Sequence, residues 1–510
     1  MIYDDKLARR SILGGAAALG AGAALAGCGG DEAPAGPGAD SATLNALITA
    51  EYNAILAYDA GIQVLRNPPM GDPQAGVAII LATIANNWKY HHEEHAAALV
   101  AAARLIAAPT VERPTTLTPP AGFTAEGTID ASGCIVCPGL VDLSARLREP
   151  GLEYKATLES EMAAAAAGGV TTLACPPDTD PPLDEPGLVE MLRHRARLPE
   201  FANVHPVGAL TVALAGQRLT EMAELAEAGC IAFGQANIAV VDTQVLLRAM
   251  QYAATFGFSV WLQAQDPYLA RGGVAHDGEV AARLGLTGMP VVAETIALAT
   301  LLHLARETGV RLHLQRISSA AGLEMIRAAR AAGIAVTCDV AAHQLHLCEN
   351  DIGWFDPHCR LDPPLRSSAD RQALRAGLAD GGIDALCSDH TPVDDDAKQA
   401  PFAEAEPGAT GLELLLPLTL RWAAEMKLPL AKALARVTSD PARVLGIPAG
   451  SLAPGAAADI CVFDPEATFR VSRETLRSQG KNTPFLGHAL KGRVRYTLIE
   501  GHLAHHDDMA

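Results

Sequence analysis

The sequence predicts an α/β fold: a (β/α)8 barrel with a small flanking β-sandwich, preceded by an α-helical hairpin. After residue 136, short apolar runs alternate with amphipathic helical patterns, and this alternation is typical of parallel strands connected by helices. Eight such runs favour a closed barrel. The predicted strands have the sequences GLVDL, VTTLAC, NVHPVG, CIAF, SVWLQ, RLHLQ, AVTCDV and DALCSD.

The composition indicates a large core and more than one structural unit. The chain has 510 residues, of which 49% are hydrophobic and 19% charged, so two or three units are expected. Its formal net charge of −19 argues against nucleic acid as a partner, because binding there depends on neutralising phosphates with Lys and Arg. Small metabolites or protein partners fit this composition better.

Residues 1–28 predict an export signal. Twin arginines, Arg9 and Arg10, precede a short apolar stretch that ends in the small-residue sequence LAGC, and these are the marks of a secretory signal. The LAGC sequence resembles a bacterial lipobox. That resemblance implies a lipid on Cys28, which is the only membrane attachment that we expect. Residues 29–40 follow as a flexible tether.

Residues 41–107 predict a hairpin of two helices. Apolar residues recur there at helical spacing, Ser41 is a suitable N-cap, and the sequence NPPMGDP interrupts the pattern. The segment resembles the first half of a ferritin-like bundle of the exported bacterial kind, and this implies Glu51, His92 and His95 as metal ligands. Because half a bundle carries at most half of such a ligand set, a solvated polar face on a packing helix is the alternative. Residues 108–120 form a Pro/Thr-rich linker.

The rest of the chain predicts the barrel and its flanking sheet. Residues 137–444 supply the barrel, and residues 121–136 and 445–510 supply the pieces of the β-sandwich. Active sites of such barrels lie at the C-terminal ends of the strands, so functional residues are expected there.

From Ala121 to the C-terminus the chain resembles dihydroorotases, which are cyclic amidohydrolases. The motifs that carry the resemblance occur in the order of that family: PGLVDLSARLREPG, AGGVTTLACPPDTDPP, GGVAHDGEVAARLGL, LDPPLR, ALCSDHTP and GSLAPGAAADICVFDP. The resemblance implies two metal ions that share a hydroxide, which attacks the amide carbonyl of a cyclic ureide while an aspartate handles the proton.

The positions that hold the metal ligands in that family carry other residues here. They are Ser144, Arg146, Gln235, Gln263 and Arg316. Asp389 alone remains, as a remnant general base. Glutamine binds transition metals poorly and arginine cannot deprotonate to become a ligand. We therefore expect no metal in the barrel, and we expect Arg146 or Arg316 to pair with Asp389.

The positions that would contact substrate have also changed. Arg148 matches the arginine that grips a substrate carboxylate in the family, a role that suits guanidinium. Acidic residues, Asp178 and Asp362, stand where the family has asparagines. His343 and His346 follow a predicted strand, as candidates for either the pocket or packing.

The whole pattern resembles the inactive dihydroorotase homologues that accompany aspartate transcarbamoylase in some bacteria. This resemblance implies a non-catalytic assembly subunit of pyrimidine biosynthesis, in a homo- or hetero-oligomer with the catalytic chain of that enzyme. Two alternatives remain open. One is an active dihydroorotase or related cyclic amidohydrolase that uses zinc to hydrolyse a cyclic amide C–N bond; the other is an exported ferritin-like metal-binding lipoprotein. The barrel implies the cytoplasm, whereas residues 1–28 indicate export, and this conflict suggests a gene fusion or a joined gene model.

Overall fold

The computed structural model describes residues 129, 131–197 and 201–507. The predicted export signal, Cys28, the tether, the linker and the hairpin with Glu51, His92 and His95 all fall outside these residues. Within the described ranges, no helix is both long and apolar enough to cross a membrane.

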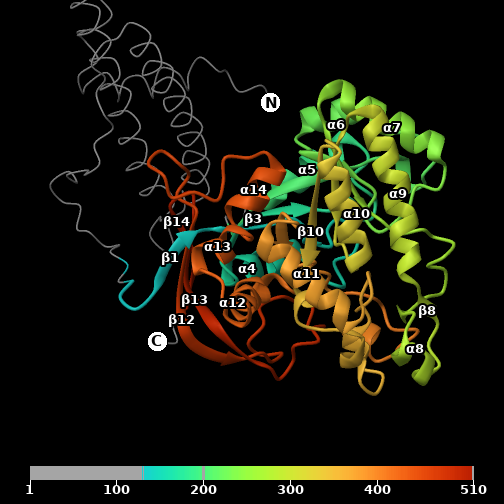
Figure 1. Cartoon of the computed structure of the whole chain (residues 1–510). Coiled ribbons are helices and arrows are strands. Elements are labelled where there is room, and N and C mark those ends of the chain that lie inside the picture. The colour runs from blue at the N-terminus through green and yellow to red at the C-terminus, as the bar shows by residue number, and fades with distance from the viewer. Residues whose placement is uncertain (1–128, 130, 198–200, 508–510) are drawn as a thin grey trace, which may run out of the picture. The chain divides into compact units, whose positions relative to one another are not determined.

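Eight parallel strands form the barrel (Figure 1). They are β2 (Leu140–Asp142), β3 (Val170–Cys175), β4 (Asn203–Ala209), β5 (Ala232–Gly234), β6 (Ser259–Gln263), β9 (Arg311–Gln315), β10 (Val336–Ala341) and β11 (Ala385–Cys387). Each lies on one of the eight predicted runs, or overlaps it with an end shifted by one residue. These runs could be recognised because strands buried on both faces are apolar throughout; all six residues of β3, for example, are buried.

The barrel closes at its C-terminal end. The sheet runs in the order β11-β10-β9-β6-β5-β4-β3-β2, and its two edges meet through a parallel bridge between Ala145 and His390. The amide of Arg146 donates to the carbonyl of His390 (2.9 Å), and the amide of His390 donates to the carbonyl of Ser144 (3.1 Å). Closure therefore depends on the residues that follow β2 and β11, where functional residues are expected.

Helices surround the strands (Figure 1). They are α4 (Leu158–Ala167), α5 (Pro186–Arg197), α6 (Met222–Ala228), α7 (Thr243–Phe256), α9 (Val291–Thr308), α10 (Ala320–Ala331), α11 (Ser368–Asp380), α12 (Leu415–Met426), α13 (Leu430–Ala435) and α14 (Ser439–Leu445). Between β6 and α9 an excursion carries β7 (Ala275–His276), α8 (Glu279–Leu284) and β8 (Gly288–Met289). Side-chain caps begin several of the helices, such as Ser367 before α11.

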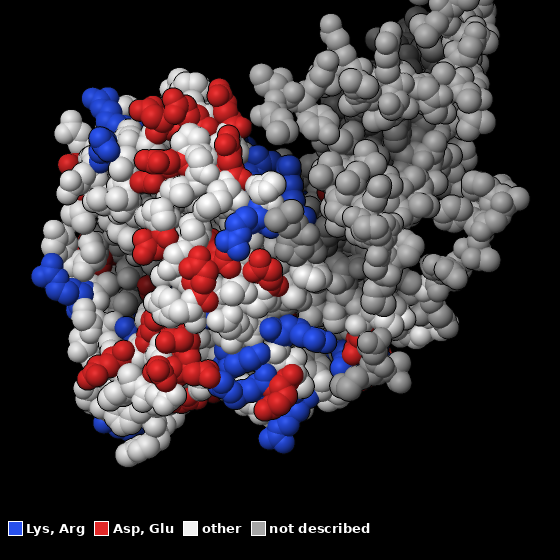
Figure 2. Space-filling model, turned by 180° about the vertical axis from the view of Figure 1, so that it is seen from behind, with Lys and Arg blue, Asp and Glu red and all other residues white. Residues whose placement is uncertain are grey.

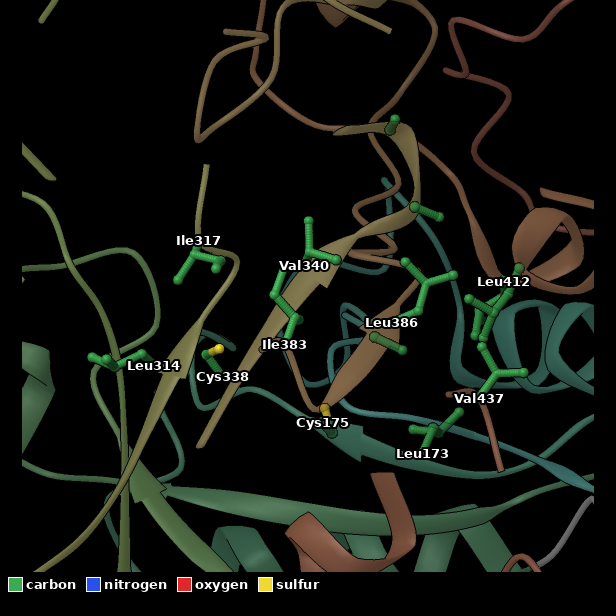
Figure 3. Packing of buried hydrophobic residues seen from close by; sticks show 14 of the residues in the cluster. Leu173, Cys175, Leu314, Ile317, Cys338, Val340, Ile383, Leu386, Leu412 and Val437 are labelled. Carbon is green, nitrogen blue, oxygen red and sulfur yellow. The ribbon is translucent and has the colours of Figure 1, made fainter. Parts of the chain in front are cut away.

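The core lies between the strands and these helices. Leu314, Val340 and Leu386, on the neighbouring strands β9, β10 and β11, are fully buried. Figure 3 shows them together with Leu412 and Val437 from the segments around α12 and α13. The apolar side chains of successive strands thus form one continuous cluster.

A four-stranded antiparallel sheet flanks the barrel. It consists of β1 (Ile135–Pro138), β12 (Ile460–Arg470), β13 (Ala489–Ile499) and β14 (His502–His506), in that order. The sequence predicts a β-sandwich at this position, and the described residues supply a single sheet. Helices α12 and α4 pack against it, and Thr497 donates a hydrogen bond to the carbonyl of Ala166 in α4 (2.7 Å). These helices bury the apolar face that a second sheet would cover in a sandwich.

Two glutamates, the buried Glu161 and the partly buried Glu413, hold a C-terminal segment against the barrel. Glu161 accepts hydrogen bonds from the hydroxyl of Ser478 (2.6 Å) and the amide of Gln479 (2.9 Å). Glu413 accepts from the amides of Arg477 (2.7 Å) and Ser478 (3.1 Å). Both carboxylates thus accept backbone amides of the segment and fix its path.

Replacing Glu413 with Gln is expected to change how stability depends on pH. Burial, together with the neighbouring Glu161, raises the pKa of Glu413 from 4.5 to about 7. A carboxyl whose pKa rises on folding contributes its full stability below its unfolded pKa and loses it as the pH rises through its folded pKa. From pH 4.5 to pH 8, wild type should therefore lose up to about 3 kcal/mol relative to Glu413→Gln. Urea denaturation at several pH values measures this difference, and parallel profiles would contradict it.

Candidate functional site

The residues predicted to form the site follow the C-terminal ends of the barrel strands. Ser144 and Arg146 follow β2, Asp178 follows β3, Gln235 follows β5, Gln263 ends β6, Arg316 follows β9, His343 and Asp362 lie between β10 and α11, and Asp389 follows β11. Several strand ends have a left-handed backbone, with φ of 50° at Ala236, 52° at Arg316 and 50° at Asp389. Such backbone conformations are costly for residues other than glycine and cluster at functional sites. The barrel therefore keeps strained turns at the strand ends where catalytic residues lie in this type of fold.

Two arginines share the carboxylate of Asp389. Arg316 Nη1 lies 3.0 Å from Asp389 Oδ1, and Arg146 Nη1 lies 3.5 Å from the same oxygen. Arg146 Nη1 also donates to the hydroxyl of Thr391 at 3.0 Å. Arg146, Arg316 and Asp389 are exposed by only 5%, 2% and 5%. The pairing expected from the sequence is thus present, and the contact with Arg316 is the shorter one.

Asn237 joins these two arginines, and the sequence did not reveal it. Its Oδ1 accepts from Arg146 Nη2 and from Arg316 Nη2, each at 2.7 Å, and its Nδ2 donates to Asp362 Oδ2 at 3.1 Å. Asn237 lies in the sequence GQAN, two residues beyond the position that was predicted. The signal that could have pointed to Asn237 is its polar amide side chain, which lies close to the end of a strand.

Gln235, the predicted residue, makes none of these contacts. Its Nε2 donates instead to the hydroxyl of Thr211 (2.7 Å) and the carbonyl of Leu214 (2.9 Å), both in the loop after β4. Gln235 thus lies apart from the contacts that join the two arginines. The left-handed turn at Ala236 separates the two side chains and leaves Asn237, not Gln235, in contact with the arginines.

Further acidic and amide groups complete the network. Gln263 Oε1 accepts from Arg316 Nη2 (3.0 Å), and its Nε2 donates to Asp362 Oδ1 (3.3 Å). Asp178 Oδ2 accepts from Arg146 Nε (2.7 Å). Burial raises the pKa of Asp178, but Arg146 outweighs burial and holds that pKa below its usual range. Burial likewise lowers the pKa of Arg146, whereas Asp178 and Asp389 raise it above the usual value. Arg146 and Asp178 therefore keep each other charged.

Ser144 and Arg148 lie outside this network. Within the described residues, the buried hydroxyl of Ser144 has no hydrogen-bond partner. Arg148 Nε donates to the carbonyl of Pro392 at 2.8 Å and forms no ion pair with a described residue. Burial and the nearby Arg146 lower its pKa. The arginine that matches the substrate-binding position is thus fixed against a loop.

Three buried histidines lie after β10 and β11: the predicted His343 and His346, and His390, which follows Asp389. Burial lowers the pKa of His343 to about 4, so its ring is neutral at pH 7. His346 Nε2 lies 2.9 Å from the carbonyl of Leu418, which fixes it as a packing residue. His390 contacts Glu161 through Nε2 and accepts a backbone amide through Nδ1. His346 therefore connects the loop after β10 to α12, and His390 connects the end of β11 to α4. The charges of Asp389 and Arg316 act on His343.

These residues do not fit the zinc that the dihydroorotase resemblance implies. Zinc takes deprotonated sulfur, imidazole or carboxylate ligands, whereas Arg146 and Arg316 offer only positively charged donors. The carboxylate of Asp389 is already bound by both. No group of three or more His, Cys, Asp or Glu residues in the described ranges could hold a metal ion. The two guanidinium groups bring fixed positive charge to strand-end positions that hold metal ligands in that family.

Little space remains beside the network. A cavity of about 10 Å³ lies next to Arg316 and is lined by Gln263, Gln265, Glu294 and Arg366 among others. This volume suffices for about one water molecule, whereas pockets for small molecules measure roughly 300–1,000 Å³. Side chains, rather than open volume, therefore occupy this part of the barrel mouth.

Comparisons with known proteins agree with this architecture. Residues 133–321 match the family profile described as Dihydro-orotase-like. A "Dihydroorotase-like protein" of Pseudomonas aeruginosa is 48% identical over 386 residues, which are 76% of this chain and 91% of the relative. A "Dihydroorotase" of Syntrophotalea carbinolica is 41% identical over 377 residues, covering 74% of this chain and 89% of that protein.

A solved structure shows the same fold. The L-hydantoinase (dihydropyrimidinase) of Arthrobacter aurescens superposes with a TM-score of 0.67 at 27% identity, over 75% of this chain and 88% of that one. The superposed fold and the sequence similarity agree with each other. The chain therefore belongs to the dihydroorotase-like family.

Proposed function

We propose that this chain is a non-catalytic member of the family and serves as an assembly subunit for the catalytic chain of aspartate transcarbamoylase, in cytoplasmic pyrimidine biosynthesis. The observation that carries the absence of catalysis is the set of contacts among Arg146, Arg316, Asn237 and Asp389. Hydrolysis of a cyclic amide at a binuclear centre needs a polarised carbonyl and an activated water. Here the remaining carboxylate is bound by two arginines.

The chemistry that these residues support is ion pairing between strand ends. Arg316 connects the ends of β9 and β11, and Arg146 connects those of β2, β3 and β11. Asn237 adds the end of β5. Such a network holds the mouth of the barrel closed, which suits a protein whose role is to present a rigid surface to a partner.

An active cyclic amidohydrolase is the second candidate. It is favoured by the similarity to proteins named dihydroorotase and to the L-hydantoinase structure. Five changed ligand positions oppose it, because fixed positive charge at Arg146 and Arg316 repels a divalent cation.

Purified full-length protein is expected to contain no stoichiometric zinc and to show no turnover of dihydroorotate in either direction. The physical reason is the donor set at the strand ends. Metal analysis and an assay of the chain with and without added zinc measure both quantities, with a dihydroorotase from the same family as the positive control. Zinc near stoichiometry together with turnover would reject the proposed absence of catalysis.

Co-expression with the aspartate transcarbamoylase catalytic chain of the same genome tests the assembly role. The two chains are expected to co-elute in size-exclusion chromatography as a complex of defined mass, and carbamoyl transfer should be retained. Separate elution of two well-folded proteins would count against the assembly role and would leave the metal and turnover results unaffected.

A further inference from the structure

Two loops at the C-terminal end of the barrel carry exposed apolar side chains. Tyr268 and Leu269, in the loop after β6, are 63% and 40% exposed, and Trp354, in the loop after β10, is 87% exposed. Val292, at the start of α9, is 44% exposed. We call these four residues the rim surface. Tryptophan and tyrosine are the residues that most often dominate the binding energy of protein interfaces.

Contacts within the segment between β6 and α9 hold Tyr268 and Leu269 near Val292, and this segment also approaches the loop that carries Trp354. The amide of Asp266 donates to the carbonyl of Ala293 (2.8 Å), and Ala270 packs with Met289 and Ala293, so the segment with Tyr268 lies on the start of α9. The excursion after β6 also touches the loop after β10. A Cβ atom added to Gly278 would lie 2.7 Å from Glu349 Oε2.

The structure fixes the backbone on both sides of Trp354. Its neighbours Gly353 and Phe355 both have a left-handed backbone, with φ of 55° and 64°, and Phe355 packs against the core. Backbone hydrogen bonds from Gly353 to Asn350 (3.2 Å) and from Asp356 to Ile352 (3.0 Å) close the turn. A left-handed conformation is strained for a bulky residue such as Phe355. A loop held in this way loses less entropy on binding than a mobile one.

The charge around the rim surface is acidic. The exposed basic residues of these two loops are Arg271 and Arg283. Six acidic residues of the same loops form no ion pair with a described residue, namely Asp266, Asp277, Glu279, Glu349, Asp351 and Asp356. Figure 2 shows acidic side chains gathered at its lower left, where the region of α8 and β8 comes after the half turn from Figure 1.

This charge selects among the possible occupants. A second copy of the chain would bring the same carboxylates against themselves, and like charges across an interface cost affinity. Nucleic acid and anionic membranes are repelled for the same reason. A protein whose surface has basic residues around an apolar centre is complementary to the rim surface in charge and in apolar character.

We infer that the rim surface is the docking site of this barrel for a basic, apolar-centred face of a protein partner, with Trp354 as its anchor. The inference rests on the proposed function, in which that partner is the catalytic chain of aspartate transcarbamoylase. In enzymes of this fold, the loops of the barrel mouth build the active site. Here the same loops would bind a protein.

The test compares substitutions on and off the rim surface, in full-length protein titrated with the purified catalytic chain. Trp354→Ala is expected to weaken association at least about tenfold, because buried tryptophans are typical hot spots. Asp351→Lys combined with Asp356→Lys should weaken it and reduce its dependence on salt. Leu503→Ala is the control, since Leu503 is 55% exposed on β14 in the flanking sheet, and it should change the dissociation constant by less than about twofold.

The outcomes separate this inference from the proposed function. Wild-type association that survives Trp354→Ala and the double charge reversal unchanged would overturn the docking site and leave the partner intact. No association of the wild-type chain would overturn the partner, and the inference with it. Thermal melting of each variant shows whether a loss of binding reflects unfolding instead.

Discussion

Replacing Asp389 with alanine is expected to destabilise the protein by about 3–5 kcal/mol. Asp389 is the only carboxylate that pairs with the guanidinium of Arg316, at 3.0 Å, within the described residues. Both groups are almost fully buried. Removing the acid leaves a guanidinium without a counter-charge, and the cost of a buried unpaired charge is far larger than the net value of the pair. Urea denaturation at pH 7 measures the change in the free energy of unfolding.

The same substitution at a surface pair provides the control. Asp395 pairs with Arg473, but both side chains are about half exposed, so Asp395→Ala should cost less than about 1 kcal/mol. Equal small effects at Asp389 and Asp395 would show that the barrel mouth does not depend on its ion pairs. In that case the structural role given to the arginines would be wrong.

Replacing Trp422 with alanine is expected to cost about 3–5 kcal/mol. Trp422 lies on α12, the helix that packs against the flanking sheet, and only 1% of it is exposed. Its Nε1 has no hydrogen-bond partner in the described part of the chain, so the loss is one of packing and buried apolar area. Urea denaturation again measures the free energy of unfolding.

Trp354→Ala is the matched control for this change. Because Trp354 is 87% exposed, its removal should alter the free energy of unfolding by no more than about 0.5 kcal/mol. A loss at Trp422 no larger than that at Trp354 would contradict the role of α12 in joining the sheet to the barrel. The same measurement shows that Trp354→Ala is folded, as the binding experiment requires.

The barrel could be predicted because its determinants are local. Strands buried on both faces are continuous apolar runs, and amphipathic segments between them leave little choice of topology. The flanking region was less certain. Its strands were visible as alternating runs, but whether a second sheet or helices cover their apolar face depends on segments distant in the sequence, here α4 and α12.

The site could be predicted in part. Because parallel strands end at the same edge, Arg146, Arg316 and Asp389 were expected to meet, and they do. Asn237 was missed because the backbone turn at Ala236 decides which side chain of GQAN reaches the arginines. A single dihedral angle of this kind leaves no trace in residue type or spacing.

By itself, the sequence determined the eight strands, the family and the residues expected at the positions of the metal ligands, since each depends on residue identity at a known place along the chain. The tertiary structure decided that both arginines share Asp389, that Asn237 connects them, and that Trp354 and Tyr268 stand exposed on loops at the barrel mouth. These are relations between side chains far apart in the sequence. They depend on how the backbone turns at each strand end and on which loops pack against one another.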